Sequence, residues 1–327
     1  MESLTACPSC GSEKIKACFD ARDIFYKVSD ENFTLSVCQN CKLHFLSRRV
    51  VASAVGAYYP SEYSPYNNKT SNAVINKESF VNKLLFAPIV ILNKIVKTLI
   101  IGRYDRKWNS FRMPESSAKS IVDFGCGDDS YLNLFKEKGK ITIGMDFTPT
   151  VISKVKESGH VGILYDSETA WDQIPDSSVD FVRMSHVVEH LYDPSNVFSK
   201  LYQKMRPGGL LHIMVPNPEG ISARIFGKYF LAFADLPRHV MMFPLKGLMR
   251  LLESKHFEVV GTLQEIVTKD FVRSIFIKKN YRNVDTNAMH AEVNNIKINE
   301  LLFTPMALAA LFSKSDRYHL LVRKARV

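Results

Sequence analysis

The sequence predicts an α/β fold, in which a parallel sheet is covered by helices, with a small cysteine-bearing module in front of it. From Lys119 onward, apolar runs of strand length alternate with helical stretches, as in a parallel sheet with crossover helices. Before residue 50 the apolar runs are short and lie between two pairs of cysteines. The length of 327 residues suits two folding units, or one large unit with an accessory module.

Three segments follow from these changes of pattern. We expect residues 1–50 to form the cysteine-bearing module, residues 51–113 a Tyr/Pro-rich linker with an amphipathic helical segment, and residues 114–327 the α/β domain. Within that domain we expect a loop insertion over residues 216–243 and a helical insertion over residues 264–317.

The expected strands are short apolar runs bounded by turn residues. In the module they are 14–19, 24–28 and 33–37, and in the α/β domain they are 120–124, 141–146, 161–165, 179–185 and 210–215, with 258–263 and 319–323 completing the sheet. Thr148 and Asp193 each precede a proline. This predicts two helix starts, because the side chain caps the helix and proline fits its first turn.

The composition excludes several classes of protein. Hydrophobic residues make up 46% and charged residues 23%, so the chain is not disordered. Asn93 and Lys94 interrupt the longest apolar stretch, so we expect no membrane-spanning segment, and the first ten residues lack a secretory pattern, which predicts a cytoplasmic protein. The net charge of +10 favours anionic partners such as nucleic acid, phosphorylated metabolites or an acidic membrane face.

The paired cysteines predict a structural zinc site. Cys7 and Cys10 are separated by two residues, as are Cys38 and Cys41, and 27 residues separate the pairs. Four thiolates close a tetrahedral shell around zinc, and each short spacing lets one turn present two sulfurs to the metal. Gly11 suits a turn with positive φ after the first pair, whereas Lys42 follows the second pair and specifies that turn less well. The alternative is four unliganded thiols, with Cys18 and His44 as spare ligands.

A glycine loop follows the first strand of the α/β domain. The sequence from Asp123 to Asp129 reads Asp-Phe-Gly-Cys-Gly-Asp-Asp, and a helix is expected to start near Ser130. Glycines in such a turn let a ligand approach the backbone, and the helix start offers free N–H groups. Asp146 lies 23 residues after Asp123, where nucleotide-binding folds place an acid that holds ribose hydroxyls. Ser130 stands where a dinucleotide fingerprint has its third glycine, which argues against a nicotinamide enzyme.

These residues resemble class I S-adenosylmethionine-dependent methyltransferases. The motifs are Ile121 to Asp129, Asp146, Ser185-His186, Glu189 to Pro194 and Arg206 to Gly209, and the resemblance covers about residues 105 to 265. The cysteine pairs, Tyr58-Tyr59-Pro60 with Tyr63, Pro216-Asn217 and Pro237-Arg238-His239 further resemble a bacterial branch with an N-terminal zinc-binding segment. Members of that branch act in sugar or cell-surface polysaccharide biosynthesis, and some in secondary metabolism.

The resemblance implies roles for individual residues. The loop would pass beside the methionine moiety with Asp123 near its amino group, Asp146 would hold the ribose, Phe147 would stack on adenine and Asp166 would meet the adenine edge. The implied cofactor-binding residues are therefore Asp123, Gly125, Cys126, Gly127, Asp146, Phe147, Asp166 and Ser185. Asp129 replaces the family's third glycine. Its side chain would crowd the cofactor or repel its carboxylate, which leaves a non-catalytic cofactor-binding scaffold as an alternative.

The candidate catalytic residues are His186, His190 and His239. Methyl transfer to a sugar hydroxyl needs a base, and histidine suits that role at neutral pH. His186, Glu189 and His190 would share one face of a helix or turn after the fourth strand. The alternative is that Glu189 and His190 only hold loops by hydrogen bonds. The same letters match an H-x-x-E-H zinc-protease pattern, which a position at a strand end disfavours.

Arg238 and Tyr59 are the candidate substrate-binding residues. Arg238 would take a phosphate of a nucleotide-linked sugar, or would instead anchor its loop by an ion pair. Tyr58, Tyr59, Tyr63 and Tyr66 would stack on rings or pack the linker. The apolar segments 84–101 and 301–312 would lie on a membrane surface, or would be buried in the core or in a dimer contact.

The sequence therefore predicts a methyltransferase with a Rossmann-like sheet and an N-terminal zinc ribbon, using S-adenosylmethionine and a structural zinc. The expected acceptor is a small, sugar-containing molecule, and a peripheral membrane contact in surface polysaccharide synthesis is an alternative use of the apolar segments. The alternative enzyme is an rRNA methyltransferase. A zinc module joined to a methyltransferase core resembles the bacterial rRNA guanine methyltransferases, and the basic net charge of this chain would suit RNA. The loop at 237–239 and the motif at 58–60 favour a metabolite over nucleic acid.

Overall fold

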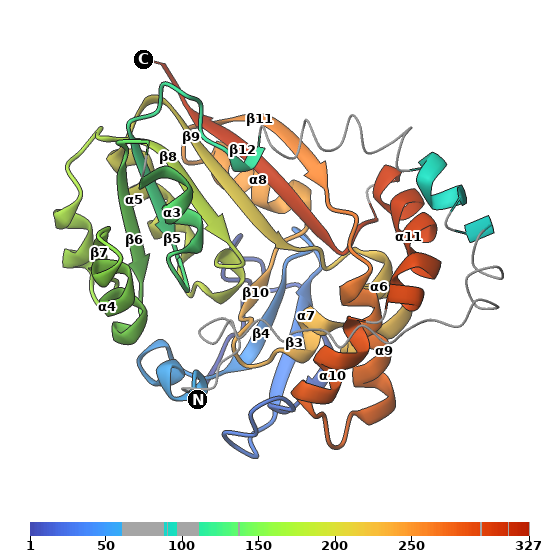
Figure 1. Cartoon of the computed structure of the whole chain (residues 1–327). Helices are drawn as coiled ribbons and strands as arrows, with labels where there is room; N and C mark the ends of the chain where they lie inside the picture. Colours follow the sequence, from blue (N-terminus) through green and yellow to red (C-terminus); the bar gives the residue numbers. More distant parts are fainter. Residues whose placement is uncertain are drawn as a thin grey trace.

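The computed structural model describes residues 1–60, 88–89, 91–96, 111–136, 138–294, 296–312 and 314–326. Tyr63, Tyr66 and most of the apolar segment 84–101 lie outside the described residues. The described chain forms two sheets and several helices that pack together (Figure 1).

The larger sheet has seven strands in the order β11-β12-β9-β8-β5-β6-β7. Their bounds are β5 Ser120–Phe124, β6 Ile141–Asp146, β7 Val161–Leu164, β8 Val179–Ser185, β9 Met205–Pro216, β11 Phe257–Gln264 and β12 Arg317–Lys324. All seven predicted strands of this domain are confirmed. Strands β5 to β9 pair in parallel, whereas β12 runs antiparallel to both neighbours. The parallel sheet is confirmed for β5 to β9, and the direction of the completing run at β12 was not predicted, because an apolar run carries no information about direction.

Helices cover the larger sheet, and α3, α4 and α5 begin close to their predicted starts, whereas no start was predicted for α8. They are α3 Ser130–Lys136, α4 Pro149–Glu157, α5 Pro194–Lys204 and α8 Leu245–Glu253. The Asp193 carboxylate accepts the N–H of Asn196 and caps α5 as predicted. Thr148 occupies the equivalent position before α4, but its side chain makes no capping bond, so that part of the prediction was wrong.

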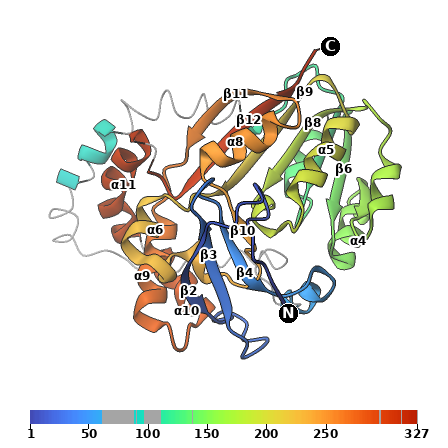
Figure 2. The ribbon, with the colours of Figure 1, turned by 180° about the vertical axis from the view of Figure 1, so that it is seen from behind.

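The smaller sheet joins the N-terminal module to the loop insertion. It contains β1 Glu2–Ser3, β2 Ile15–Ala21, β3 Phe33–Cys38, β4 His44–Arg49 and β10 Met241–Met242. Its order is β1-β4-β3-β2, and β10 also pairs with β4 (Figure 2). The predicted strand at 24–28 is instead a loop, because the Asp23 carboxylate accepts the N–H groups of Tyr26 and Val28. Strand β4 was not predicted.

The two insertions form a helical layer beside the smaller sheet. The loop insertion contains α6 Ile221–Phe226, the 3₁₀ helix η6 Gly227–Tyr229 and α7 Leu231–Ala234, and the helical insertion contains α9 Lys269–Asn280, α10 Thr286–Val293 and α11 Ile296–Leu311. A common apolar cluster joins Ile24 of the module to Ala234, Ile277 and Met289. None of the helices in the described ranges is long and apolar enough to cross a membrane.

Candidate functional site

A cleft of about 1860 Å³ opens beside the carboxyl ends of β5, β6 and β8. Its walls come from three parts of the chain. The sheet contributes Gly125, Gly127, Asp146, Phe147, Asp166, Ser185, His186 and His190; the module and the 3₁₀ helix η1 Ala52–Tyr58 contribute Phe25, Tyr26, Val55 and Tyr59; and the insertions contribute Leu231, Asp235, His239, Asp270, Arg273, His290 and Arg317. This position, at the carboxyl edge of a parallel sheet, is where α/β folds bind their ligands.

The glycine loop forms the floor of one side of the cleft. Gly125 and Gly127 have φ angles of +70° and +63°, which side chains rarely adopt. A Cβ atom on Gly125 would lie 2.4 Å from Cγ2 of Val187, so a larger residue would displace the segment that follows β8. The Cys126 side chain is buried among Leu132, Val151 and Val155, which leaves its backbone for a ligand.

Asp123 lies beneath this loop and is held by Arg183, whose Nη1 donates to both carboxylate oxygens at 3.0 and 2.9 Å. Burial raises the pKa of Asp123 to about 6, although the charge of Arg183 opposes that shift. Asp123 is 1% exposed and is not among the residues that line the cleft, so the structure does not bring it to the predicted contact with a ligand amino group.

Asp146 and Phe147 end β6 at the rim of the loop. The Asp146 carboxylate accepts the N–H of Gly127 at 3.0 Å and the N–H of Thr148 at 2.9 Å, one on each oxygen. Each oxygen keeps a second lone pair, so the group can still accept hydrogen bonds from a pair of hydroxyls. The Phe147 ring is 43% exposed at the cleft, and Tyr59 packs against it edge-on at 4.8 Å between centroids. A carboxylate beside an exposed aromatic ring fits a nucleoside.

Asp129 does not enter the cleft. Its carboxylate accepts hydrogen bonds from the Asn133 amide and from the hydroxyl of Ser158, which hold it against the ends of α3 and α4. It is absent from the cleft lining, although its neighbours Asp128 and Ser130 are present. The expectation that this side chain crowds a bound cofactor was therefore wrong, because its hydrogen-bond partners lie on the other side of the loop.

His186 and Glu189 form a hydrogen-bonded pair directly after β8, in which Glu189 is buried and His186 is partly exposed. The Glu189 carboxylate is 1% exposed and its Oε1 accepts from Nδ1 of His186 at 3.0 Å. Burial alone would raise the pKa of Glu189, but the hydrogen bond and the charge of His186 lower it, so the carboxylate stays ionised. Because Nδ1 is the donor, Nε2 of His186 carries the lone pair, and it has no hydrogen-bond partner among the described residues. His186 has a φ of +56°, a strained conformation often found at functional sites.

His190 and His239 lie next to this pair, with their rings 4.8 Å apart. Nδ1 of His190 faces the carbonyl of Arg238 at 3.0 Å and the hydroxyl of Tyr59 at 2.9 Å, and Nδ1 of His239 faces the carbonyl of Ala232 at 2.8 Å. Since a carbonyl only accepts, both rings are protonated on Nδ1. Burial and the charge of His239 lower the pKa of His190 to about 4, which makes it a weak base.

Glu189, His190 and His239 also bring possible metal-ligand atoms within 4.8 Å of one another. Glu189 already holds His186, and the two histidines are oriented by backbone carbonyls. Their positions are thus explained by protein contacts, without a metal ion.

Arg238 does not face the cleft. Its side chain is fully buried, and it donates to Asp23 at 2.8 Å, to Asp235 at 2.6 Å and to the carbonyl of Tyr58 at 3.1 Å. The predicted phosphate contact was wrong. The guanidinium instead ties the module and η1 to the loop insertion, which is the alternative of an ion-paired anchor.

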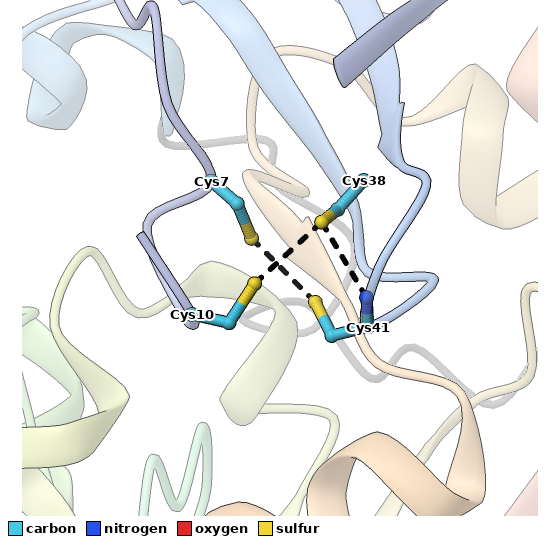
Figure 3. Close-up of side chains that lie close together, drawn as sticks. All are labelled: Cys7, Cys10, Cys38 and Cys41. Atoms are coloured by element: carbon cyan, nitrogen blue, oxygen red, sulfur yellow. Dashed lines mark hydrogen bonds between the residues drawn. The ribbon is translucent and has the colours of Figure 1, made fainter. Parts of the chain in front are cut away.

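The four paired cysteines converge at one end of the smaller sheet (Figure 3). The Sγ atoms of Cys7 and Cys41 are 3.6 Å apart, as are those of Cys10 and Cys38. A zinc ion with bonds of about 2.3 Å needs sulfurs about 3.8 Å apart, so the group fits a tetrahedral zinc. Gly11 and Lys42 both have positive φ, and each donates its N–H to the first cysteine of its pair at 2.9 Å. The second turn is therefore built like the first despite its lysine, and Cys18 and His44 lie outside the group.

The sequence did not single out the charged residues on the insertion wall. Asp270, Arg273 and Arg317 line the cleft but come from α9 and β12. Arg183 was also missed. Arg183 and Asp123 lie opposite each other on the adjacent strands β8 and β5. Opposite charges within two neighbouring predicted strands could have indicated that they pair.

Comparison with known proteins identifies one family. A family model described as a methyltransferase domain matches residues 99–262, half of the chain. A probable S-adenosylmethionine-dependent methyltransferase of Mycolicibacterium smegmatis is 28% identical over 150 residues, which are 45% of this chain and 55% of that protein. A ubiquinone biosynthesis O-methyltransferase of Bradyrhizobium is 28% identical over 136 residues, 40% of this chain and 54% of the other. The chain spans about half the length of these curated relatives.

Among solved structures, a SAM-dependent methyltransferase from Archaeoglobus fulgidus is similar with a TM-score of 0.44 and 23% identity, covering 75% of this chain and all of the other.

Proposed function

We propose that this chain, which belongs to the methyltransferase-domain family, binds S-adenosylmethionine in the cleft and transfers its methyl group to a small acceptor held by the opposite wall. The observation that carries the proposal is a single cleft with two sets of groups. A glycine loop with Asp146 and Phe147 lies on one side, and the His186–Glu189 pair lies beside it.

The cofactor side fits an adenosine with an attached amino acid. Gly125 and Gly127 line the cleft without side chains, so the methionine portion can approach their backbone, while Asp146 accepts from the ribose hydroxyls and Phe147 covers the adenine. Asp166 and Ser185 line the same part of the cleft and complete the proposed contacts. When bound, S-adenosylmethionine supplies a methyl group on a positively charged sulfur, which becomes a neutral thioether once the methyl has bonded to the acceptor.

His186 is the proposed base. Glu189 orients the ring and stabilises its protonated form, so Nε2 can take the proton of an acceptor hydroxyl while the oxygen attacks the methyl carbon. The rest of the catalysis is alignment and exclusion of water by the three walls. Tyr59 closes the cleft between Phe147 and His190, and in this reading it contacts the acceptor.

We propose a sugar-containing metabolite as the acceptor, in cytoplasmic synthesis of surface polysaccharide or a secondary metabolite. The support is a cleft walled by the module and both insertions, which suits a small molecule better than an RNA duplex. The net charge of +10 is what favours an rRNA substrate. RNA binding that falls steeply with salt would support that second candidate.

A peripheral membrane contact is proposed for α11. Leu301, Leu308, Leu311 and Phe312 are 47% to 76% exposed along and just after this helix. Exposed apolar side chains of this kind would bring the enzyme to a lipid-linked acceptor. Flotation with anionic liposomes tests it, and protein that stays entirely at the bottom of the gradient would refute it.

We further propose that the four paired cysteines hold a structural zinc. The support is the separation of their sulfurs and the matched turns at Gly11 and Lys42. Four sulfurs close the coordination shell, so this metal would stabilise the module and take no part in the transfer.

Calorimetric titration of the full, zinc-loaded chain with S-adenosylmethionine tests the proposed function, with NAD as the control. We expect micromolar binding of the first and none of the second. NAD binding without S-adenosylmethionine binding would refute the proposal. If the cofactor binds but no candidate acceptor is turned over, the non-catalytic scaffold becomes the better description.

A further inference from the structure

The insertion wall of the cleft carries a charged cluster that the proposed transfer does not use. Arg317, the first residue of β12, donates from Nε and Nη2 to the two oxygens of Asp270 at 2.6 and 2.7 Å. Arg273, one turn along α9, donates from Nη1 to the same carboxylate at 3.1 Å. All three residues line the cleft. We call them the arginine cluster.

The two arginines are not equivalent within this cluster. Arg317 is held on two sides, since Glu265 approaches its Nη1 at 3.8 Å from behind the wall. The charge of Arg317 lowers the pKa of the buried Asp270, which therefore stays ionised. Arg273 shares that single carboxylate through one N–H, and its side chain is 23% exposed. A guanidinium has five N–H donors, so Arg273 keeps most of its donors for a ligand in the cleft.

The charges that line the cleft are divided between its walls. The acids Asp128, Asp146, Asp166, Glu168 and Asp193 lie at or after the ends of β5, β6 and β7 and after η5 Val188–His190, and Arg183 of β8 is the cation on this side. The insertion wall carries Arg273 and Arg317 together with the acids Asp270 and Asp235, and Asp235 is paired with the buried Arg238. Figures 1 and 2 both place α9 on the other side of the molecule from β6. An anion that enters is therefore repelled by the first wall, where acids outnumber the one arginine, and less so by the insertion wall, where two arginines share the single carboxylate of Asp270.

The neighbours of Arg273 are suited to the same ligand. His290 of α10 lines the cleft nearby, and burial together with the charge of Arg273 lowers its pKa, so it stays neutral at pH 7. Asn287 of the same helix adds an uncharged amide. His186 lines the same cleft as Asp270 and Arg273. A ligand bound at Arg273 thus extends toward the proposed base.

Building on the proposed function, we propose that the acceptor carries a phosphate or diphosphate group, that Arg273 binds this group, and that Asp270 and Arg317 hold Arg273 in place. Arg273 is then a specificity-determining residue, and a nucleotide-linked sugar is an acceptor of the required class. A guanidinium suits this ligand because it can donate two parallel hydrogen bonds to one phosphate.

The test uses pyrophosphate as the probe, titrated calorimetrically into the full, zinc-loaded chain saturated with S-adenosylhomocysteine, at about 150 mM salt to screen nonspecific attraction. We expect Arg273→Gln to weaken pyrophosphate binding about tenfold or more, since charged hydrogen bonds are lost. Arg273→Lys should restore part of that loss by keeping the charge. Arg282→Gln removes an exposed arginine of the same insertion outside the cleft, and should leave the affinity unchanged.

Equal pyrophosphate affinity in the wild type and Arg273→Gln would overturn the inference. So would an equal loss in Arg282→Gln, which would indicate attraction by net charge alone, and so would Arg273-dependent binding of malonate in place of pyrophosphate. S-adenosylhomocysteine binding separates the two proposals. If it fails in the wild type, the proposed function fails, whereas if it is intact and pyrophosphate does not bind, only the phosphate site fails.

Discussion

Replacing Asp146 with asparagine tests the cofactor side of the cleft most directly. The carboxylate accepts two backbone N–H groups, one on each oxygen. Asparagine keeps one accepting oxygen and turns an amide donor toward the other N–H, so one backbone donor loses its partner. An unsatisfied buried donor costs about 1–3 kcal/mol, which is the loss of unfolding free energy we expect for Asp146→Asn.

The effect on cofactor affinity is separate from that loss of stability. Hydrogen bonds from ribose hydroxyls to a carboxylate contribute about 1.5–3 kcal/mol, so S-adenosylmethionine should bind about 10- to 150-fold more weakly to Asp146→Asn. Calorimetry measures the affinity and urea denaturation the stability. Asp176→Asn is the control, because Asp176 lies outside the cleft and pairs with Lys204. Affinity within twofold of the wild type would refute the assignment of Asp146.

The pH dependence of binding gives a second measurement on the same residue. Burial raises the pKa of Asp146, so its carboxylate is protonated at a higher pH than an exposed aspartate. The ionised form binds the ribose, so affinity should fall on acidification through that pKa and be flat at higher pH. The Asn variant should lack this dependence, and a wild type with flat affinity down to pH 4 would contradict the reasoning.

Three further predictions concern other sites. Metal analysis should find about one zinc per chain in the wild type. The zinc should be lost in Cys41→Ser and kept in the control Cys18→Ser. If Cys41→Ser keeps its zinc, the metal would instead be assigned to Glu189, His190 and His239. Glu189→Gln should lower turnover about 10²- to 10⁴-fold with S-adenosylmethionine affinity intact, as measured by S-adenosylhomocysteine release, and unchanged turnover would remove the dyad from the mechanism. Burial raises the pKa of Asp316 to about 7, so its contribution to stability is lost as pH rises from about 4 to 7. Asp316→Asn should therefore gain about 1 kcal/mol or more over the wild type between pH 5 and pH 7.5, and urea midpoints that differ equally at both pH values would refute this.

The elements that could be predicted from sequence are those whose signal is local. Strands β5, β6 and β8 are rich in buried apolar residues because both faces of the sheet are covered, and Gly125 and Gly127 stand where the backbone needs positive φ. The Cys-x-x-Cys pairs are local as well. Asp129 shows the limit of such reasoning, since its position in the loop was evident but the direction of its side chain depends on Ser158 of another helix.

The residues that were misassigned depend on partners far away in the sequence. In the sequence, Arg238 looks like an accessible arginine in a loop. In the folded chain it is buried and paired with Asp23, which lies 215 residues earlier. The arginine cluster was overlooked for the same reason, because α9 and β12 carry its members and only the folded chain turns them toward the cleft. The loop at 24–28 was taken for a strand because the run is apolar, but Asp23 satisfies its N–H groups within the loop.

A path of backbone hydrogen bonds links the cysteine module to the proposed base. Strand β4 starts three residues after Cys41, and the N–H of Leu46 in this strand donates to the carbonyl of Val240 at 3.0 Å. The N–H of Val240 donates in turn to the carbonyl of Glu189 at 2.8 Å, while β10 continues the same sheet from Met241. If zinc holds Cys38 and Cys41, it fixes the turn between β3 and β4 and, through Val240, the backbone of the residue that orients His186. A metal with no open coordination position would then still control the rate, because the module forms a wall of the active site.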